Sequence, residues 1–300
     1  MSAQHPFRFG VVMGQASSVS EWVAKAREAE SLGFSTVLMP DTLGQTWSPF
    51  PALAALATAT TTIRLGTYVL ANDMRNPVMV ARESATLDVL SEGRFELGLG
   101  VGRPNAGDDY RKLGMQFESG AVRVARFAES LKIISALLGG WHASASGPHY
   151  AVADADIFPS PVQQPRPPIL IAGARKRLLT LAGQHADIVA LAVQPNADEA
   201  AVAEAIGWLR DAAGDRFEQI ILNCNLITVG EKVASWIAAR YGGDISALRQ
   251  SQSISVLMGS PDEMSQQLEE RRARWGISYI TLSEEFVDAF APVVERLAGR

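Results

Sequence analysis

Cysteine and histidine are scarce in this sequence of 300 residues. The single cysteine, Cys224, cannot form a disulfide within the chain and is typical of a protein from a reducing compartment. The four histidines, His5, His142, His149 and His185, are scattered without the spacing that a metal site requires. We therefore expect no internal disulfide and no metal site.

Long apolar runs and an excess of basic residues are also lacking. No apolar run approaches the length of a membrane span, and the first residues lack the basic and apolar regions of a signal peptide. The net charge is −5, with 27 basic against 32 acidic residues, which argues against nucleic acid or an anionic membrane as a partner. We expect a cytoplasmic protein in which the adjacent acids Asp108 and Asp109 are solvated.

The composition that is present is that of an ordinary globular protein. Hydrophobic residues make up 47% of the chain and charged residues 20%, which is sufficient for a large core without disulfides. Because no linker divides the sequence, we expect a single domain over residues 1–300.

The most unusual stretch is residues 87–105, LDVLSEGRFELGLGVGRPN. It predicts the end of a helix, a turn at Gly93 and a strand in which Gly98, Gly100 and Gly102 share one face. Glycine weakens a strand, so three in register indicate that another group approaches the backbone closely. That group is either a flat ligand or a neighbouring helix. A dinucleotide fingerprint is disfavoured, because the spacing Gly-x-Gly-x-x-Gly fails here.

Apolar runs alternate with helical periodicity along the whole chain. Eight strands, each followed by a helix, are predicted at residues 7–13, 36–39, 63–70, 95–101, 169–172, 188–193, 220–229 and 277–282. Strand–helix–strand units of this length make parallel strands. Eight units in a chain slightly longer than about 250 residues predict an α/β fold, the (β/α)8 TIM barrel. An open doubly wound sheet would also alternate, but eight units favour closure.

Two stretches interrupt the alternation and are expected to be insertions. Residues 139–168 include the proline-rich run PSPVQQPRPP, which cannot form a helix or a central strand. We expect a hairpin excursion there, lying over one end of the fold. Residues 230–260 are the second insertion, with a helix predicted at 233–241 and a poorly periodic stretch after it.

The predicted strand ends contain few groups that could catalyse a reaction. Catalytic residues of such a barrel lie at the C-terminal ends of the strands. These ends contain one carboxylate, Asp41, and neither histidine nor cysteine. Considered alone, Asp41 would be a helix or loop cap. A rim this poor in acids, bases and nucleophiles indicates that a bound cofactor carries the chemistry.

The loop of residues 173–177, Gly-Ala-Arg-Lys-Arg, opens a predicted helix. A helix start favours anions, so three basic residues there would each cost about 0.3 to 1 kcal/mol if unpaired. A phosphate bound among them would explain the pattern. The alternative is that all three side chains are simply solvated.

Four segments together resemble the luciferase-like monooxygenase family, in the branch that uses the deazaflavin coenzyme F-420. They are LGTYVLANDMRNP, LDVLSEGRFELGLGVG, ASASGPHYAV and ILIAGARKRLLTLAGQHADIVAL. The match runs from Phe7 to about Leu282. The resemblance implies a bacterial luciferase-like TIM barrel, a small-molecule substrate and a homodimer.

The resemblance also assigns residues to the coenzyme ring. Asp41 matches an acid that contacts the deazaflavin, and Val101 with Gly102 match the pair that lies along it. Tyr68 and Val69 match a pair joined by a non-prolyl cis peptide that supports the ring from behind. We therefore predict a cis peptide at Tyr68–Val69.

Further cofactor-binding positions follow from the same match. Ala71 and Asn105 lie beside the ring positions at the ends of the third and fourth predicted strands. Gly173 and Ala174 match a phosphate loop that usually has two glycines, and the basic residues that follow are expected to contact the coenzyme: Arg175, Lys176 and Arg177. Arg103, Arg111 and Lys112 are expected to meet its oligoglutamate tail. The alternative is that the arginines form ion pairs with Asp108 and Asp109 and leave nothing for the tail.

The departures from the family concern proton transfer. In the similar deazaflavin-dependent glucose-6-phosphate dehydrogenase a histidine and a glutamate transfer protons, and Thr42 and Arg103 stand at those positions here. They are the candidate catalytic residues, and sugar-phosphate dehydrogenation is not expected. We expect an oxidoreductase that passes a hydride between reduced coenzyme F-420 and an unsaturated or carbonyl-type substrate. An FMN-dependent monooxygenase and a non-catalytic flavin- or deazaflavin-binding protein stay open as alternatives.

Overall fold

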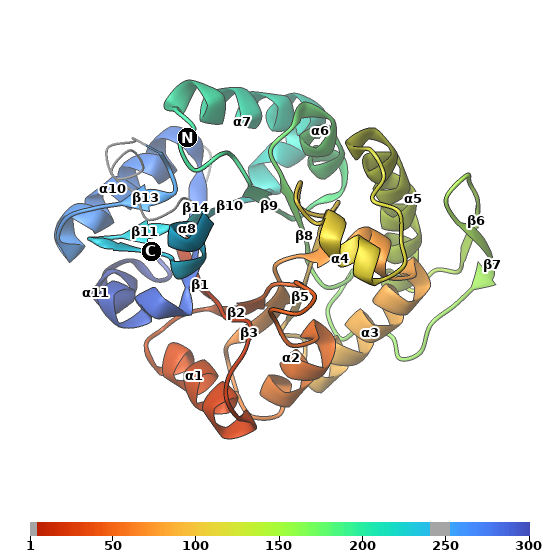
Figure 1. Cartoon of the computed structure of the whole chain (residues 1–300), viewed down its shortest axis with the longest axis horizontal. Helices are drawn as coiled ribbons and strands as arrows, with labels where there is room; N and C mark the ends of the chain where they lie inside the picture. The colour runs from red at the N-terminus through yellow and green to blue at the C-terminus, as the bar shows by residue number, and fades with distance from the viewer. Residues whose placement is uncertain (1–4, 241–252) are drawn as a thin grey trace. The chain divides into compact units, whose positions relative to one another are not determined.

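The computed structural model describes residues 5–240 and 253–300 (Figure 1). Its nine-stranded sheet has the order β3-β2-β1-β14-β10-β9-β8-β5-β4, and β3 also pairs with β5, so the order is cyclic. Parallel strands in this cyclic order alternate with helices along the chain, which is a (β/α)8 barrel. The predicted fold class is confirmed.

The barrel strands lie close to their predicted positions. They are β1 (Arg8–Val12), β2 (Thr36–Met39), β3 (Arg64–Thr67), β5 (Phe95–Gly100), β8 (Ile169–Gly173), β9 (Ile188–Leu191), β10 (Ile221–Leu226) and β14 (Ile277–Ser283). The third predicted strand is broken: β3 ends at Thr67, and β4 (Leu70–Ala71) then pairs with β5. The seventh is likewise divided into β10 and β11 (Thr228–Val229).

The helices also follow the predicted order. They are α1 (Val19–Ser31), α2 (Pro49–Ala57), α3 (Pro77–Leu90), α4 (Gly107–Lys112), α5 (Gly120–Leu138), α6 (Lys176–His185), α7 (Glu199–Ala213), α8 (Ser235–Arg240), α10 (Pro261–Trp275) and α11 (Val287–Leu297), with the short 3-10 helices η1 (Asn72–Met74), η2 (Gly214–Gln219) and η3 (Glu284–Phe286). Helix α4 was not predicted. Across the described ranges, no helix is both long and apolar enough to span a membrane.

The chain divides into two compact units. The first contains Met1–Met13, Lys25–Leu38 and Ala172–Arg300, and the second contains Gly14–Ala24 and Met39–Ile171. The predicted single domain stays a prediction.

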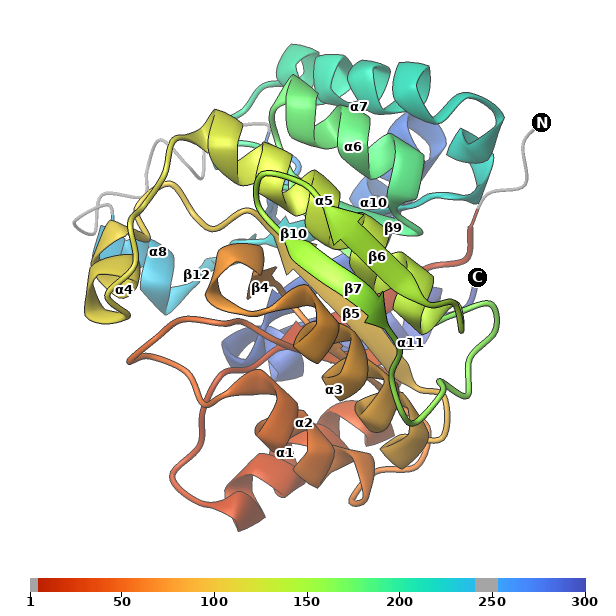
Figure 2. The same ribbon diagram turned by 90° about the vertical axis from the view of Figure 1, so that its right-hand side faces the viewer.

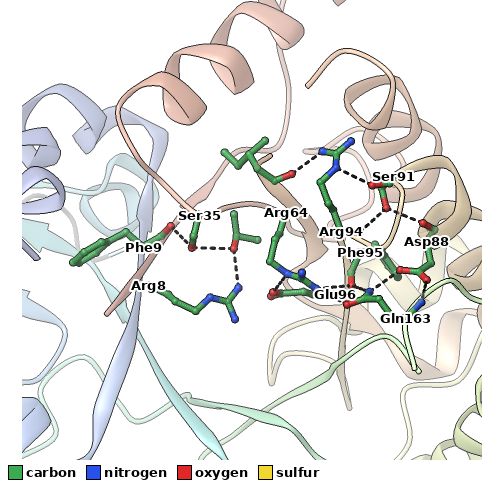
Figure 3. Close-up of polar contacts among 12 residues, drawn as sticks. Arg8, Phe9, Ser35, Arg64, Asp88, Ser91, Arg94, Phe95, Glu96 and Gln163 are labelled. Carbon is green, nitrogen blue, oxygen red and sulfur yellow. Dashed lines mark hydrogen bonds and ion pairs between the residues drawn. The ribbon is translucent and has the colours of Figure 1, made fainter. Parts of the chain in front are cut away.

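The first unit is built around aromatic residues at the start of the chain. The ring of Phe9 packs edge-on against Phe290 with centroids 5.6 Å apart, and both side chains are buried. Polar contacts tie β1 to the chain just before β2: the Ser35 hydroxyl donates to the Phe9 carbonyl at 2.9 Å (Figure 3). Helices α6 and α7 lie side by side in this unit (Figure 1).

The second unit has its own core of tryptophan and phenylalanine. Trp22 is fully buried, and its indole N–H donates to the Ala52 carbonyl at 2.9 Å. Its ring lies 5.4 Å from that of Trp47, and Phe50 lies 6.1 Å from Phe95 of β5. These contacts bury the apolar faces of α1 and α2.

The excursion at residues 139–168 belongs to the second unit. It contains the predicted hairpin, in which β6 (Ala143–Ser146) pairs antiparallel with β7 (Ala151–Ala155). Contrary to the prediction of a cover over one end of the fold, the hairpin lies along helix α5 (Figure 2). The helix that precedes the hairpin holds it, because the Glu129 carboxylate of α5 accepts hydrogen bonds from the backbone N–H groups of His149 and Tyr150, both at 3.2 Å.

The chain that returns from this hairpin is held by a buried carboxylate. Asp88 of α3 accepts hydrogen bonds from the backbone N–H groups of Val162 and Gln163 at 2.8 and 2.9 Å. The Gln163 amide also donates to Asp88 at 2.6 Å and to the Phe95 carbonyl at 2.7 Å (Figure 3). Buried backbone donors need acceptors, so Asp88 fixes the proline-rich segment against α3.

The second predicted insertion contains a small sheet of three strands. Strand β11 pairs with β12 (Lys232–Val233) and with β13 (Val256–Leu257). The helix predicted at 233–241 is α8, which ends at Arg240. Of the poorly periodic stretch predicted after this helix, up to residue 260, residues 241–252 lie outside the described residues.

Candidate functional site

The glycine strand β5 is approached closely by another part of the backbone. A Cβ atom at Gly98 would lie 1.9 Å from the carbonyl oxygen of Thr67. The Thr67 hydroxyl donates to the Gly98 carbonyl and accepts from the Gly98 N–H, both at 2.8 Å. At Gly98 the close neighbour is therefore strand β3, and both the flat ligand and the neighbouring helix are wrong for this position.

The two residues after β5, Val101 and Gly102, are fixed by other contacts. Gly102 has a φ of +80°, where side chains are rarely tolerated, and a Cβ there would lie 3.0 Å from the Tyr110 hydroxyl. The buried Arg123 guanidinium donates to the carbonyl of Val101 and, at 3.0 Å, to that of Gly102. Because Arg123 donates to both carbonyls, it fixes the backbone of Val101 and Gly102, the pair that the resemblance places along the coenzyme. Both residues are half-buried.

The predicted cis peptide is present between Tyr68 and Val69, just after β3. Both residues are half-buried, and the Tyr68 N–H donates to the Met39 carbonyl at 2.7 Å. Ala71, two residues further, is buried at the end of β4. Tyr68 and Val69 lie between β3 and β4, and both of these strands pair with β5 in the second unit.

Asp41 follows β2 and is engaged by an arginine that sequence reasoning did not single out. Arg75 contacts both carboxylate oxygens: Nη2 donates to Oδ1 at 3.1 Å, and Nη1 donates to Oδ2. The backbone N–H of Ala71 makes a longer contact to Oδ2 at 3.4 Å. The expectation of a simple cap for an isolated Asp41 is therefore wrong, because its main partner is a guanidinium 34 residues away.

The two candidate catalytic residues, Thr42 and Arg103, differ in whether an ion pair holds the side chain. Thr42 is half-buried and begins a turn in which its carbonyl accepts from Thr46. Arg103 forms an ion pair with Asp109 at 2.6 Å, and this acid is buried. The prediction that Asp109 is solvated is wrong, because helix α4 turns its carboxylate onto Arg103. Asn105, also a predicted cofactor position, is exposed.

The other predicted tail residues lie on α4. Arg111 pairs with Asp108 at 3.2 Å across one helical turn, and both side chains are largely exposed. Asp108 is thus solvated, as predicted. The basic exit for an oligoglutamate tail stays a prediction, with two of its three cations already paired to neighbouring acids.

The basic loop belongs to the first unit and contrasts with these pairs. Arg175, Lys176 and Arg177 are exposed, and within residues 5–240 and 253–300 none of them forms an ion pair. Helix α6 begins here with no side chain capping its N-terminus and no acid in its first turn. Gly173 is buried and Ala174 half-buried at the end of β8. The donor set is the one that a phosphate group requires.

The residues that usually transfer protons or attack substrates lie elsewhere. His5 precedes β1, His142 and His149 lie in the excursion, and His185 ends α6. Burial raises the pKa of the Cys224 thiol to about 11, so this residue is not a thiolate at neutral pH. No cluster of three possible metal ligands occurs in the described part of the chain.

Residues 2–229 match the luciferase-like monooxygenase family. The chain belongs to this family. A protein of Beutenbergia cavernae named F420-dependent glucose-6-phosphate dehydrogenase is 34% identical over 168 residues, which are 53% of this chain and 48% of that protein. The chain therefore spans about half the length of the curated relatives that it matches.

Solved structures of several activities share the fold of this luciferase-like protein. The coenzyme F420-dependent tetrahydromethanopterin reductase from Methanopyrus kandleri has a TM-score of 0.78 at 18% identity, covering 98% of this chain and 99% of that one. A monooxygenase from Streptomyces bottropensis has a TM-score of 0.74 at 22% identity, covering 97% of each chain. At such identities the likeness shows the barrel and leaves the reaction open.

A cavity of about 500 Å³ lies in the second unit near Arg75. Its walls include Asp73, Asn76 and Arg126, together with Tyr150 of the excursion. Asp73 is buried and pairs with Arg126 at 2.9 Å. Sequence reasoning missed these residues, although the quoted segment LGTYVLANDMRNP contains two of them; the signal was a run of polar residues directly after a strand.

Two phenols of the second unit have a raised pKa: Tyr150, which is half-buried and lines the cavity, and the buried Tyr110. Burial, with a smaller contribution from the Asp73 carboxylate, raises the pKa of Tyr110 to about 12. Burial also raises the pKa of Tyr150, whose hydroxyl accepts a hydrogen bond from Asn72 at 3.4 Å. Both phenols are therefore neutral at physiological pH and could serve only as hydrogen-bonding groups.

Proposed function

We propose that this luciferase-like protein is an oxidoreductase that uses coenzyme F-420 to transfer a hydride to or from a small organic substrate. The observation that carries the proposal is the location of its titratable groups. The residues at the predicted site offer a paired carboxylate, a threonine and a paired arginine. Because none of these groups is an activated nucleophile, we infer that the reactive group comes from a cofactor.

The resemblance in sequence supports the choice of cofactor. Identity of 34% to an F420-dependent dehydrogenase extends over 168 residues of this chain. When bound, a deazaflavin supplies a ring carbon that accepts or releases a hydride. The protein would supply the binding groups: an acceptor at Asp41 and the carbonyls of Val101 and Gly102 held by Arg123.

Each unit contains groups that fit one polar part of such a coenzyme. Asp41 retains acceptor capacity beyond its contacts with Arg75 and Ala71, which suits an N–H or O–H of the ring. The uncapped start of α6, with its three exposed cations, suits the phosphate. Gly173 to Arg177 as the phosphate site is part of this proposal.

We propose an unsaturated or carbonyl-type substrate and not a sugar phosphate. Thr42 and Arg103 replace the histidine and glutamate that the resemblance associates with proton transfer in the sugar-phosphate enzyme. Arg103 is held by Asp109 at 2.6 Å, so its guanidinium would orient or stabilise a polar group of the substrate. Thr42 offers a hydroxyl that can donate to or accept from a substrate oxygen.

The test is a titration of the purified protein with coenzyme F-420 and with FMN, followed by absorbance and fluorescence. We expect saturable binding of coenzyme F-420 and oxidation of its reduced form by an enone or carbonyl acceptor without oxygen. Tighter binding of FMN, with oxygen consumed on reduction, would instead identify a flavin monooxygenase. Binding of coenzyme F-420 with no turnover of any acceptor would identify a carrier protein.

Two further expectations accompany this function. We propose a homodimer on the basis of the family resemblance, and a cytoplasmic location on the basis of the single cysteine, which is typical of a reducing compartment. Light scattering of the purified protein would measure the mass of the assembly, and a monomer over the micromolar range would refute the dimer.

A further inference from the structure

We propose that Arg75 is a positioning residue that acts through Asp41: it fixes and neutralises the carboxylate so that Asp41 accepts one hydrogen bond from a neutral donor of the coenzyme ring. The inference rests on the proposed function. It adds a residue that neither the sequence nor the resemblance assigned to the coenzyme.

The contact between the two side chains is a fork. The two terminal nitrogens of Arg75 reach the two oxygens of Asp41, with Nη2 at 3.1 Å from Oδ1. The side chains are 23% and 12% exposed, so the pair is partly removed from water. A bidentate arginine–carboxylate contact fixes the plane and orientation of the acid as well as its charge.

Counting acceptor sites shows what Asp41 can still do. A carboxylate has about four lone-pair sites, two on each oxygen. Oδ2 accepts from Arg75 and from the Ala71 N–H, whereas Oδ1 accepts from Arg75 alone among the described residues. Oδ1 therefore keeps one acceptor site, which is sufficient for a single N–H or O–H group.

The charge of the pair indicates which kind of donor the free site on Asp41 would accept. Asp41 and Arg75 together are neutral, so the remaining site favours an uncharged donor such as the imide N–H of a flavin-type ring. Without Arg75, an unpaired carboxylate would face a coenzyme that carries phosphate and glutamate charges. The repulsion of like charges would then weaken binding at this position.

The backbone around Arg75 does not depend on its side chain. The Arg75 N–H donates to the Asn72 carbonyl at 3.3 Å, and Asn76 caps helix α3 by accepting from the Val78 N–H at 2.9 Å. Pro77 then begins the helix. A substitution at Arg75 therefore keeps the turn and the cap, and its effect reports on Asp41.

A second pair in the same unit provides a matched control. Arg126 contacts Asp73 at 2.9 Å and is 23% exposed, as Arg75 is. Both arginines border the same cavity, but Asp73 is not a predicted coenzyme contact. Replacing Arg126 breaks a comparable ion pair without touching Asp41.

The experiment measures the Kd of coenzyme F-420 by fluorescence for Arg75→Gln, Arg75→Lys, Asp41→Asn, the double variant Asp41→Asn with Arg75→Gln, and Arg126→Gln. We expect Arg75→Gln to raise the Kd at least tenfold and Arg75→Lys to restore part of the loss. The double variant should bind within about twofold of Asp41→Asn, because the unpaired carboxylate is gone.

Two results would overturn the inference. The first is an increase in Kd for Arg75→Gln that is no larger than the increase for Arg126→Gln at an equal loss of Tm. The second is a double variant whose increase in Kd equals the product of the increases for Arg75→Gln and Asp41→Asn, because the two side chains would then act independently. If Arg75→Gln fails to fold, the Kd of Arg75→Lys is compared with that of its double variant with Asp41→Asn in the same way. Absence of binding by the unaltered protein would refute the proposed function itself and would be seen before any variant is made.

Discussion

Strand β5 and the start of helix α6 both have a sequence pattern that a ligand close to the backbone would explain, and the structure shows a different cause for each pattern. At Gly98 the space is filled by the Thr67 carbonyl of the adjacent strand. Beyond β5, Arg103 and Arg111 are paired with Asp109 and Asp108. Gly98 therefore does indicate a close approach to the strand, but the group that approaches is the backbone of β3.

The start of α6 shows the opposite situation. Its three basic side chains are exposed and unpaired within the described ranges, and no acid or capping side chain occupies the helix start. A cation count along the sequence treats the two regions alike. What distinguishes them is the neighbouring acids. The alternative that Asp108 and Asp109 pair with the arginines after β5 is confirmed, whereas no acid lies in the first turn of α6.

The largest effect should come from Gly98→Ala. The new Cβ would meet the Thr67 oxygen at 1.9 Å and the carbonyl carbon at 2.9 Å, and neither belongs to a flexible side chain. We expect loss of folding, or a decrease of more than about 4 kcal/mol in the free energy of unfolding, measured by urea titration.

Gly207→Ala is the matched control, because Gly207 lies in helix α7 and, apart from its chain neighbours and the backbone of its own helix, no heavy atom lies within 4 Å of the added Cβ. It should raise the free energy of unfolding by up to about 1 kcal/mol. A Gly98→Ala protein within 1 kcal/mol of the unaltered one, on the scale of such substitutions, would show that β3 does not hold β5 by its backbone.

A second experiment uses alkaline pH to probe the region after β5. Burial raises the pKa of Tyr110 from 10.0 to about 12 in the folded state. The stability from keeping this phenol neutral is therefore complete below pH 10 and is lost as the pH rises towards 12. Two pKa units correspond to at most about 3 kcal/mol.

The difference in the free energy of unfolding between the unaltered protein and Tyr110→Phe isolates this contribution. It should be constant below pH 10 and should decline between pH 10 and 12, where the phenol of the unfolded chain ionises first. A difference that does not change with pH would mean that Tyr110 ionises as readily in the folded protein as in the unfolded one.

Most of the barrel could be predicted because its strands and helices follow local periodicity. Helix α4 could not, since its six residues are too few to form a helix without tertiary contacts, and those come from buried Tyr110 and from Asp109 on Arg103. The Asp41–Arg75 pair joins residues 34 apart, and no spacing rule links them. The resemblance found Asp41 but not its partner.

The third experiment removes the charges at the start of α6. Arg175, Lys176 and Arg177 changed together to alanine should leave the Tm unchanged, because the side chains are exposed and unpaired. The Kd of coenzyme F-420 should rise about 5- to 100-fold, as expected for three partly screened contacts of up to about 1 kcal/mol each. An unaltered Kd would show that the loop is only a solvated surface.

The smallest effect should come from Arg111→Ala combined with Lys112→Ala on α4. Arg111 is 72% exposed and already paired with Asp108, so it has little charge to offer an oligoglutamate tail. An exposed pair contributes at most about 1 kcal/mol and is screened by salt, so we expect the Kd to change less than twofold.

The measurement compares the Kd at low and high ionic strength for coenzyme with long and with short tails. If the tail does pass here, the variant will weaken binding only of the long-tailed coenzyme at low salt, and the loss will disappear at high salt. That pattern would mean that the tail displaces Asp108 from Arg111, and the contrast between α4 and the start of α6 would then be one of competition between anions.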